Sequence, residues 1–140
     1  MSRILSLDLG EKYIGTALSD PMGVIAQPFC TIEWKGVEHL VKTLESLIHK
    51  YDIKEIIIGI PYTLKGKLSD KTKEILDIKK YLEAKLKIRI KEEDERFTTK
   101  MAKMSLIAMG KSPSKSKDKV NQLAAVFILK SYLERYNNKQ

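Results

Sequence analysis

One short, almost wholly apolar run constrains the fold of this chain more than any other part of its sequence. Residues 56–60 read Ile-Ile-Ile-Gly-Ile, and the run lies between Glu55 and Pro61. An apolar run of this length is typical of a strand that is buried on both faces of a parallel sheet. Because helices cover the faces of such sheets, the run predicts an α/β domain.

Three extended segments precede this strand. Residues 4–9 alternate in polarity, residues 13–19 form a second strand-like run, and only Gly-Glu-Lys separates them, which predicts a hairpin. A third extended segment covers residues 25–34. Pro28 within it indicates an edge strand or a bulge, because proline cannot donate a ladder hydrogen bond.

Helical segments link and follow the later strands. Residues 88–90 open a fifth strand, which runs into the acidic residues 92–95. Apolar spacing and capping signals predict four helices, which cover residues 37–51, 69–86, 98–110 and 118–136. Loops are expected around residues 62–68 and 111–117. The order βββαβαβαα predicts one domain over residues 1–140, with a five-stranded mixed sheet and helices on both of its faces.

The charge of the chain is concentrated near its C-terminus. Of 26 basic and 18 acidic residues, which give a net charge of +8, nine basic and two acidic residues lie within 100–140. Four lysines cluster there: Lys111, Lys115, Lys117 and Lys119. Such a surface attracts a phosphate backbone. A solvated lysine-rich face is the alternative, which the 22 lysines against 4 arginines favour, so charge alone leaves the two interpretations about even.

Composition argues against secretion, membrane insertion and a disulfide scaffold. The longest apolar run, residues 123–129, is far shorter than the roughly 20 residues needed to cross a bilayer. The N-terminal residues show no signal-peptide pattern. A single cysteine, Cys30, forms no internal disulfide and provides no metal cluster. We therefore expect a cytoplasmic protein without a membrane partner.

Carboxylates follow two of the predicted strands and open the last helix. Asp8 ends the first strand, Asp94 and Glu95 close the fifth, and Asp118 opens the final helix with Asn121 one turn further on. Ligand sites in such sheets gather at the carboxyl ends of the strands. The oxygens of Asp8, Glu95 and Asp118 or Asn121 are therefore expected to converge on Mg²⁺ or Mn²⁺, and two such ions can hydrolyse a phosphodiester.

Each of these residues also has a purely structural interpretation. Asp8 is followed closely by a glycine and can be a turn residue, residues 92–95 can be a solvated acidic stretch, and Asp118 can be a helix N-cap. His39 and His49 match no catalytic spacing and are expected on the surface. From the residues alone, a metal-dependent phosphoryl site is supported only modestly.

Four groups of segments occur together in a recognisable order. They are residues 7–20, residues 58–61 with Gly66, residues 94–99 (Asp-Glu-Arg-Phe-Thr-Thr), and residues 119–133 with their Ala-Ala pair. In this order, and over nearly the whole chain, they resemble the YqgF/RuvX family of RNase H-like proteins. The resemblance implies an RNase H-like fold and a metal-dependent nuclease site.

The resemblance also implies roles for individual residues. The first-strand aspartate of the family falls on Asp8, and its fifth-strand acidic pair falls on Asp94 and Glu95, with Glu95 favoured as the ligand. The family aspartate before the Ala-Ala pair is Asn121 here, which brings no charge, so Asp118 is expected to supply the third carboxylate. Asp8 would then bridge two Mg²⁺ or Mn²⁺ ions, and Glu95 and Asp118 would complete their ligand shell.

Basic side chains complete the expected site. Lys115, Lys117 and Lys119, together with Lys111, would hold the phosphate backbone, and Arg96 would orient a carboxylate or a phosphate. Members of the family are described as nucleases that process the 5′ end of pre-16S rRNA, in ribosome biogenesis. They are also described, by analogy with RuvC, as Holliday junction resolvases. On the resemblance alone, we favour precursor rRNA over branched DNA as the substrate.

Other functions remain open at this point. The chain can be a nucleic-acid-binding module with a weakened catalytic site, as Asn121 suggests. An ATP-binding role, suggested by a phosphate-binding hairpin at residues 8–10 with Gly15, is disfavoured because only one copy of the fold is present. The sequence leaves a monomer and a homodimer open, since a resolvase would need two sites. Trp34, Tyr62 and three methionines, at positions 101, 104 and 109, are expected in the core rather than in an interface.

Overall fold

The computed structural model describes residues 2–62, 68–95 and 98–138. Within them, five strands form a single sheet: β1 (Arg3–Leu9), β2 (Tyr13–Ser19), β3 (Ala26–Glu33), β4 (Ile53–Ile60) and β5 (Arg89–Asp94). Their order in space is β3-β2-β1-β4-β5. The hairpin strands β1 and β2 and the edge strand β3 run antiparallel, whereas β4 and β5 run parallel to β1. The expected mixed five-stranded sheet is confirmed, and Pro28 lies in an edge strand.

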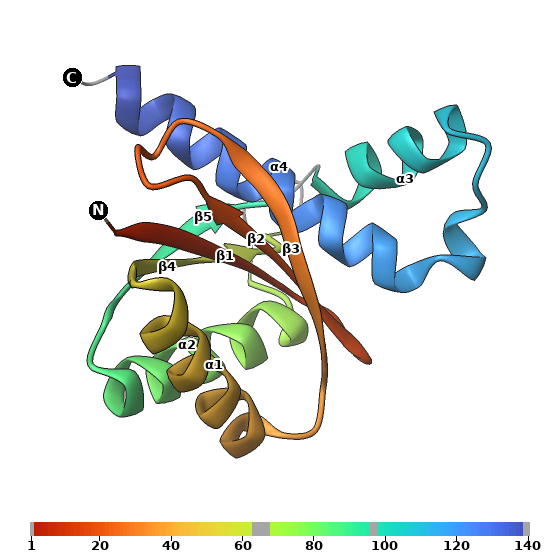
Figure 1. The fold of residues 1–140 in the computed structure, drawn as a ribbon. Coiled ribbons are helices and arrows are strands. Elements are labelled where there is room, and N and C mark those ends of the chain that lie inside the picture. Colours follow the sequence, from red (N-terminus) through yellow and green to blue (C-terminus); the bar gives the residue numbers. More distant parts are fainter. Residues whose placement is uncertain (1, 63–67, 96–97, 139–140) are drawn as a thin grey trace.

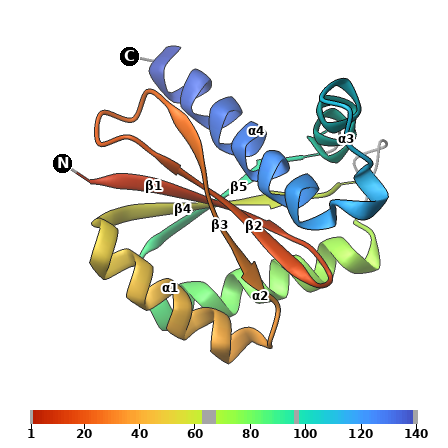
Figure 2. The ribbon, with the colours of Figure 1, turned by 45° about the vertical axis from the view of Figure 1, so that its right-hand side comes forward.

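Helices cover both faces of the sheet (Figure 1). The helices α1 (Val37–Tyr51) and α2 (Asp70–Leu86) lie side by side on one face, and α4 (Lys117–Asn138) crosses the other. The helix α3 (Thr98–Ala108) stands beyond the sheet and packs against α4 (Figure 2). The segment expected as a Lys-rich loop contains a short 3-10 turn, η1 (Pro113–Lys115).

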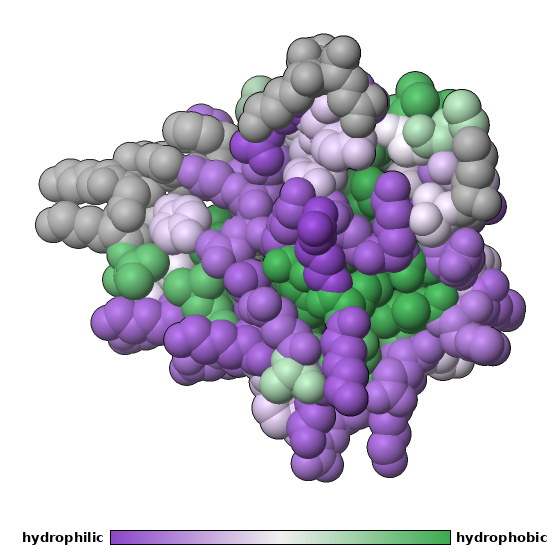
Figure 3. Space-filling view, turned by 90° about the vertical axis from the view of Figure 1, so that its left-hand side faces the viewer, coloured by the Kyte–Doolittle hydropathy of each residue, from purple (hydrophilic) through white to green (hydrophobic). Residues whose placement is uncertain are grey.

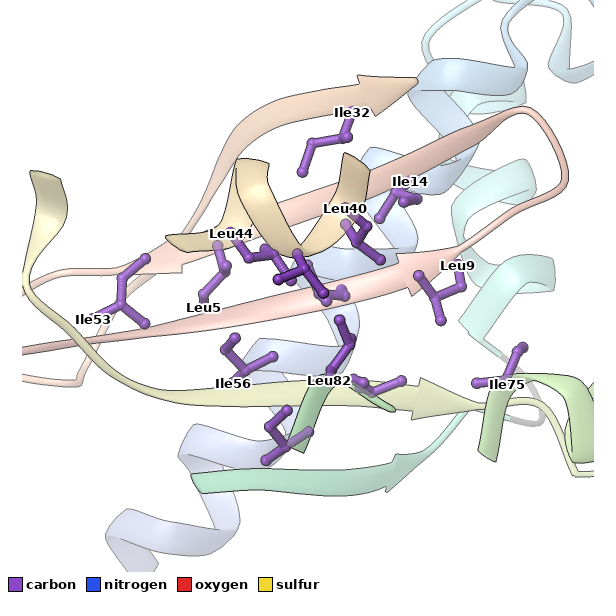
Figure 4. Packing of buried hydrophobic residues seen from close by; sticks show 14 of the residues in the cluster. Leu5, Leu9, Ile14, Ile32, Leu40, Leu44, Ile53, Ile56, Ile75 and Leu82 are labelled. Carbon is purple, nitrogen blue, oxygen red and sulfur yellow. The ribbon is translucent and has the colours of Figure 1, made fainter. Parts of the chain in front are cut away.

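The apolar run in β4 is buried on both sides, as its composition predicts. Ile56 and Ile58 contribute to the core beneath α1 and α2, where Leu5, Leu40 and Leu82 also meet (Figure 4). Ile57 faces the opposite way, into a second cluster under α4. All three isoleucines are fully buried, so β4 anchors two cores at once.

The parallel strands begin at one end of the molecule and finish at the other. Figure 3 views the end at which the parallel strands begin, and the surface there is mostly hydrophilic around a central hydrophobic area. The carboxyl ends of β1, β4 and β5 lie at the opposite end of the molecule. In the described part of the chain, no helix combines the length and the apolar character that crossing a bilayer requires.

The helix α4 lies close to the strands below it. The hydroxyl of Ser6 donates a 2.7 Å hydrogen bond to the carbonyl of Ala125, and Ala124 and Ala125 are fully buried. A Cβ atom added to Gly15 of β2 would lie 1.9 Å from the carbonyl oxygen of Asn121. Because glycine alone leaves this space, α4 can rest on β2 and bring Asn121 to the end of β1.

Candidate active site

A cavity of about 780 Å³ opens at the carboxyl ends of the parallel strands. It is lined by the β1–β2 hairpin, by the segments that follow β4 and β5, and by parts of the four elements α2, α3, η1 and α4. This is the edge of the sheet at which ligand sites of open α/β folds occur. Asp8, Glu95 and Asn121 all line the cavity, so the structure brings these three predicted residues together.

Two buried carboxyl groups form the centre of the cavity. Asp8 near the end of β1 and Glu95 directly after β5 are only 7% and 5% exposed. The backbone N–H of Glu95 donates to the carbonyl of Ile60 at 3.1 Å, which fixes the segment after β5 against the end of β4. The acidic residues 92–95 thus differ in their surroundings. Glu93 is buried and paired with Arg135, whereas Glu95 lines the cavity.

Burial and proximity change the acidity of this pair. Burial raises the pKa of Asp8, and the hydrogen bond from Glu95 and the charge of Lys71 only partly oppose it. Burial raises the pKa of Glu95 well above its usual range, and the charge of Asp8 and their mutual hydrogen bond add to the effect. Two carboxylates this close cannot both ionise cheaply, so in the absence of a cation they share a proton.

One oxygen of the pair lacks a partner. Oε2 of Glu95 is buried and accepts no hydrogen bond from the described residues. Gly59 provides the space for this carboxyl group, since a Cβ there would lie 2.8 Å from Cδ of Glu95. An unpartnered buried carboxylate oxygen beside a second carboxylate is costly unless a cation or donor completes it. The donor set therefore fits a hard divalent cation.

Asn121 occupies the third position of the site. Its Nδ2 donates a 3.0 Å hydrogen bond to the carbonyl of Tyr13, which orients the amide and leaves Oδ1 as the group able to coordinate a cation. Among the described residues, no group of three His, Cys, Asp or Glu side chains is placed to hold a metal ion. The structure thus offers two carboxylates and one amide rather than three carboxylates.

The structure does not bring Asp118 to the cavity. Asp118 is exposed in the first turn of α4 and is not among the residues that line the cavity. The helix begins at Lys117, and the side that faces the cavity carries Lys117, Val120 and Asn121. Asp118 follows Lys117 by one residue, which turns its side chain by about 100° around the helix axis.

The lysines at the cavity are mostly not those expected from the sequence. Of Lys111, Lys115, Lys117 and Lys119, only Lys117 lines the cavity. Lys119 lowers the pKa of Lys111 through a side-chain hydrogen bond and through its charge, so these two exposed ammonium groups lie close together.

Three further lysines, Lys12, Lys71 and Lys103, line the cavity and were not expected from the sequence. They come from the β1–β2 hairpin, from the first turn of α2 and from α3. Lys71 is close enough for its charge to lower the pKa of both Asp8 and Glu95. Lys71 lies in the first turn of α2, directly after the N-cap Ser69. The predicted start of this helix after β4 was the sequence signal that could have placed Lys71 near the site.

Asp94, Trp34 and Tyr62 lie outside the centre of the site. Asp94 is the exposed last residue of β5, and its charge contributes to the raised pKa of Glu95. Arg96 lies outside the described residues. Trp34 and Tyr62 pack against the core, as expected.

The prediction that the methionines at positions 101, 104 and 109 lie in the core is wrong. All three are exposed, because Ala102 and Leu106 form the side of α3 that packs against α4.

Comparisons with known proteins show the family of this chain. A family model described as "RuvX: Holliday junction resolvase" matches residues 2–135. A relative from Dictyoglomus turgidum named "Putative pre-16S rRNA nuclease" is 40% identical over 132 residues, which cover 94% of each chain. A relative of the same name from Clostridium kluyveri is 38% identical over 133 residues, which cover 95% of this chain and 97% of the relative.

Solved structures of resolvases share the fold. RuvC of T. thermophilus in complex with a Holliday junction substrate matches with a TM-score of 0.57 at 11% identity, over 98% of this chain and 96% of RuvC. The Fowlpox virus resolvase in complex with Holliday junction DNA matches with a TM-score of 0.59 at 12% identity, over 96% and 98% of the two chains. The RNase H-like fold is thereby confirmed. Because the family model and the relatives extend over nearly its full length, this chain belongs to the RuvX family.

Proposed function

We propose that this protein is a metal-dependent nuclease that processes the 5′ end of pre-16S rRNA. The observation that carries the proposal is the buried pair of Asp8 and Glu95, with an unpartnered Oε2, at the centre of a lysine-lined cavity. The names of the relatives support rRNA as the substrate. We therefore also propose that the protein acts in the cytoplasm, where ribosomes are assembled.

Asp8, Glu95 and Asn121 would hold the cations. Asp8 would be the central ligand, since it lies on the central strand β1 and its side chain meets that of Glu95. Bound Mg²⁺ or Mn²⁺, as a pair of ions, would supply an activated water and would stabilise charge on the scissile phosphate. Asn121 contributes an oxygen without charge, so it binds a hard cation more weakly than an aspartate would. We leave Asp118 out of the ligand set because it does not line the cavity.

The lysines that line the cavity would hold the substrate. Lys12, Lys71, Lys103 and Lys117 bring positive charge to the cavity from four different elements. These ammonium groups would bind the phosphates on either side of the scissile bond, without reading the base sequence. Lys111 and Lys115, on the segment that joins α3 to α4, and Lys119, in the first turn of α4, would bind the backbone outside the cavity.

Cleavage of two labelled substrates tests the proposal. One is a precursor 16S rRNA fragment that retains its 5′ leader, and the other is a four-way DNA junction, each with Mg²⁺ or Mn²⁺ and with a chelator as control. We expect metal-dependent cleavage within the RNA leader and an intact junction. Cleavage of the junction alone would instead establish the resolvase alternative, which the family description favours. Binding of RNA without cleavage of either substrate would support the alternative of a nucleic-acid-binding module with a weakened catalytic site.

Asn121→Asp tests how far the amide limits metal binding. A third carboxylate should lower the metal concentration needed for half-maximal cleavage by about tenfold, because it adds charge to a site for a hard cation. The same change removes the donor to Tyr13 and adds a third carboxyl group beside Asp8 and Glu95. In a chelator, thermal unfolding should therefore begin at lower temperature than in the unaltered protein, and added Mn²⁺ should reverse this.

Asp118→Asn is the matched control for this experiment, since it changes a carboxylate on the same helix that does not line the cavity. It should change the metal requirement by less than about twofold. A metal requirement that stays the same in Asn121→Asp would show that position 121 does not contact the cation.

A further inference from the structure

The exposed side of α3 is apolar where a surface helix is normally polar. Met101 is 46% exposed, Met104 60%, Ile107 62%, and Met109 in the following turn 56%. The buried side of α3 is small and consists of Ala102 and Leu106 against α4. Figures 1 and 2 show α3 beyond the sheet, with α4 packed beside it. A helix that is apolar on its outer side as well is expected to be covered by a partner.

The charged residues of the segment that carries this apolar row are all basic. Lys100 and Lys103 lie between the apolar residues on α3, and Lys111 follows the turn after it. The sequence from Thr98 to Lys117 contains no acidic residue. We call this set the α3 surface: Met101, Met104, Ile107 and Met109, with Lys100, Lys103 and Lys111. Its composition fits a partner that is polyanionic and also presents apolar faces.

The α3 surface continues into the candidate active site. Lys103 belongs to the surface and also lines the cavity that contains Asp8 and Glu95. A strand whose phosphate lies at the carboxylates would therefore pass along α3 as it leaves the cavity. Lys111 of the same surface also lies close to Lys119 of α4, which adds a second positive charge there.

We propose that the α3 surface binds an unpaired stretch of the nucleic-acid substrate next to the scissile bond, with Met104 and Ile107 against exposed bases and the lysines on phosphates. This inference rests on the proposed function and names the form of the substrate: single-stranded rather than duplex next to the cut. Apolar side chains gain by covering base faces that a duplex keeps stacked, and methionine and isoleucine serve as such contacts in proteins that unstack bases. A second copy of this chain fits less well, because a two-fold contact would set the lysines of the surface against themselves.

Binding in the absence of metal tests the surface apart from catalysis. The double variant Met104→Ser with Ile107→Ser removes the apolar contact and keeps every charge. Its affinity is measured by fluorescence anisotropy in a chelator, for a single-stranded RNA of about 12 nucleotides and for the same sequence as a duplex. We expect the dissociation constant for the single strand to rise about tenfold and that for the duplex to change less than about twofold. The slope of affinity against salt concentration should not change, since no phosphate contact is lost.

Two further variants act as controls. Met22→Ser alters a methionine that is 65% exposed, outside the cavity lining and on the connection between β2 and β3, and it should leave both affinities unchanged. Lys100→Gln with Lys103→Gln should weaken both ligands and should reduce the salt slope by about 2. Thermal melts of each variant check that the fold is kept.

The outcomes separate this inference from the proposed function. Equal loss for single strand and duplex, or no loss for either, overturns the role of the α3 surface even if the RNA is cleaved. Selective loss for the single strand supports it even if no substrate is cleaved, in which case only the nuclease proposal fails. If RNA binding is unchanged but light scattering shows that the double variant converts a dimer to a monomer, the surface is an interface between two copies.

Discussion

Replacing Asp8 with asparagine is expected to reduce metal-dependent cleavage by at least about a thousandfold, because the metal contributes several kcal/mol to transition-state stabilisation. Asp8 is buried, lies on the central strand and is hydrogen-bonded to Glu95, so its carboxyl group lies at the centre of the cavity. Asparagine keeps the shape of the side chain and removes its charge. Single-turnover cleavage of the labelled leader RNA measures the effect, and RNA binding in a chelator should remain within about twofold of the unaltered protein.

The same substitution should make the metal-free protein more stable at neutral pH. Asp8 and Glu95 both have raised pKa values in the folded state, so the folded protein holds protons there more tightly than the unfolded chain does. The stability of the metal-free protein therefore falls as pH rises from the usual carboxyl range, about pH 4–5, through the raised values. Asp8→Asn removes one member of the pair and flattens this part of the pH profile.

Denaturant titrations in a chelator at several pH values measure this change, with Asp118→Asn as control, because that carboxylate is exposed on α4. Added Mn²⁺ should stabilise the unaltered protein and have little effect on Asp8→Asn. If Asp8→Asn cleaves RNA at the unaltered rate, then Asp8 does not hold the metal. If the stability of Asp8→Asn depends on pH in the same way as that of the unaltered protein, Asp8 does not raise the pKa of Glu95.

Most of the fold could be predicted from the sequence because local pattern and tertiary structure agree in this chain. The apolar run in β4 is buried on both faces, and the three residues between β1 and β2 form a hairpin connection. Pro28 lies in the edge strand β3, the position in a sheet at which proline is tolerated. Each of these signals depends on a few neighbouring residues, so no knowledge of distant contacts was needed.

Site residues at the ends of strands could be predicted from the sequence. Site residues on helices could not, because their direction depends on how each helix is turned about its own axis. Asp8 and Glu95 follow from the rule that ligand sites form at the carboxyl ends of parallel strands. The choice between Lys117 and Asp118 depends on where α4 begins, because one residue turns a side chain by about 100°. The position of Lys71 at the cavity depends on how α2 is placed after β4. The exposure of Met104 depends on which side of α3 packs against α4. These are properties of packing between elements, which periodicity within one element does not determine.

The structure also predicts a large loss of stability for Gly15→Ala. Gly15 pairs with Asp8 across the hairpin and lies directly beneath α4. A Cβ there would lie 1.9 Å from the carbonyl oxygen of Asn121 and 2.5 Å from the backbone nitrogen of Gln122. Backbone atoms of a packed helix cannot rotate away, so the whole of α4 would have to move from the sheet. We expect the free energy of unfolding to fall by about 3 kcal/mol or more, measured by urea denaturation.

Gly23→Ala is the matched control for this prediction. Gly23 has a φ of +71°, and a Cβ there would meet no atom within 4 Å, so the substitution carries only the backbone cost of about 1 kcal/mol. Because α4 carries Asn121, Gly15→Ala should also raise the Mn²⁺ concentration needed to stabilise the folded protein, whereas Gly23→Ala should not. Equal losses of stability in the two variants would mean that α4 does not rest on β2, and the position of Asn121 beside the carboxylates would lose its structural basis.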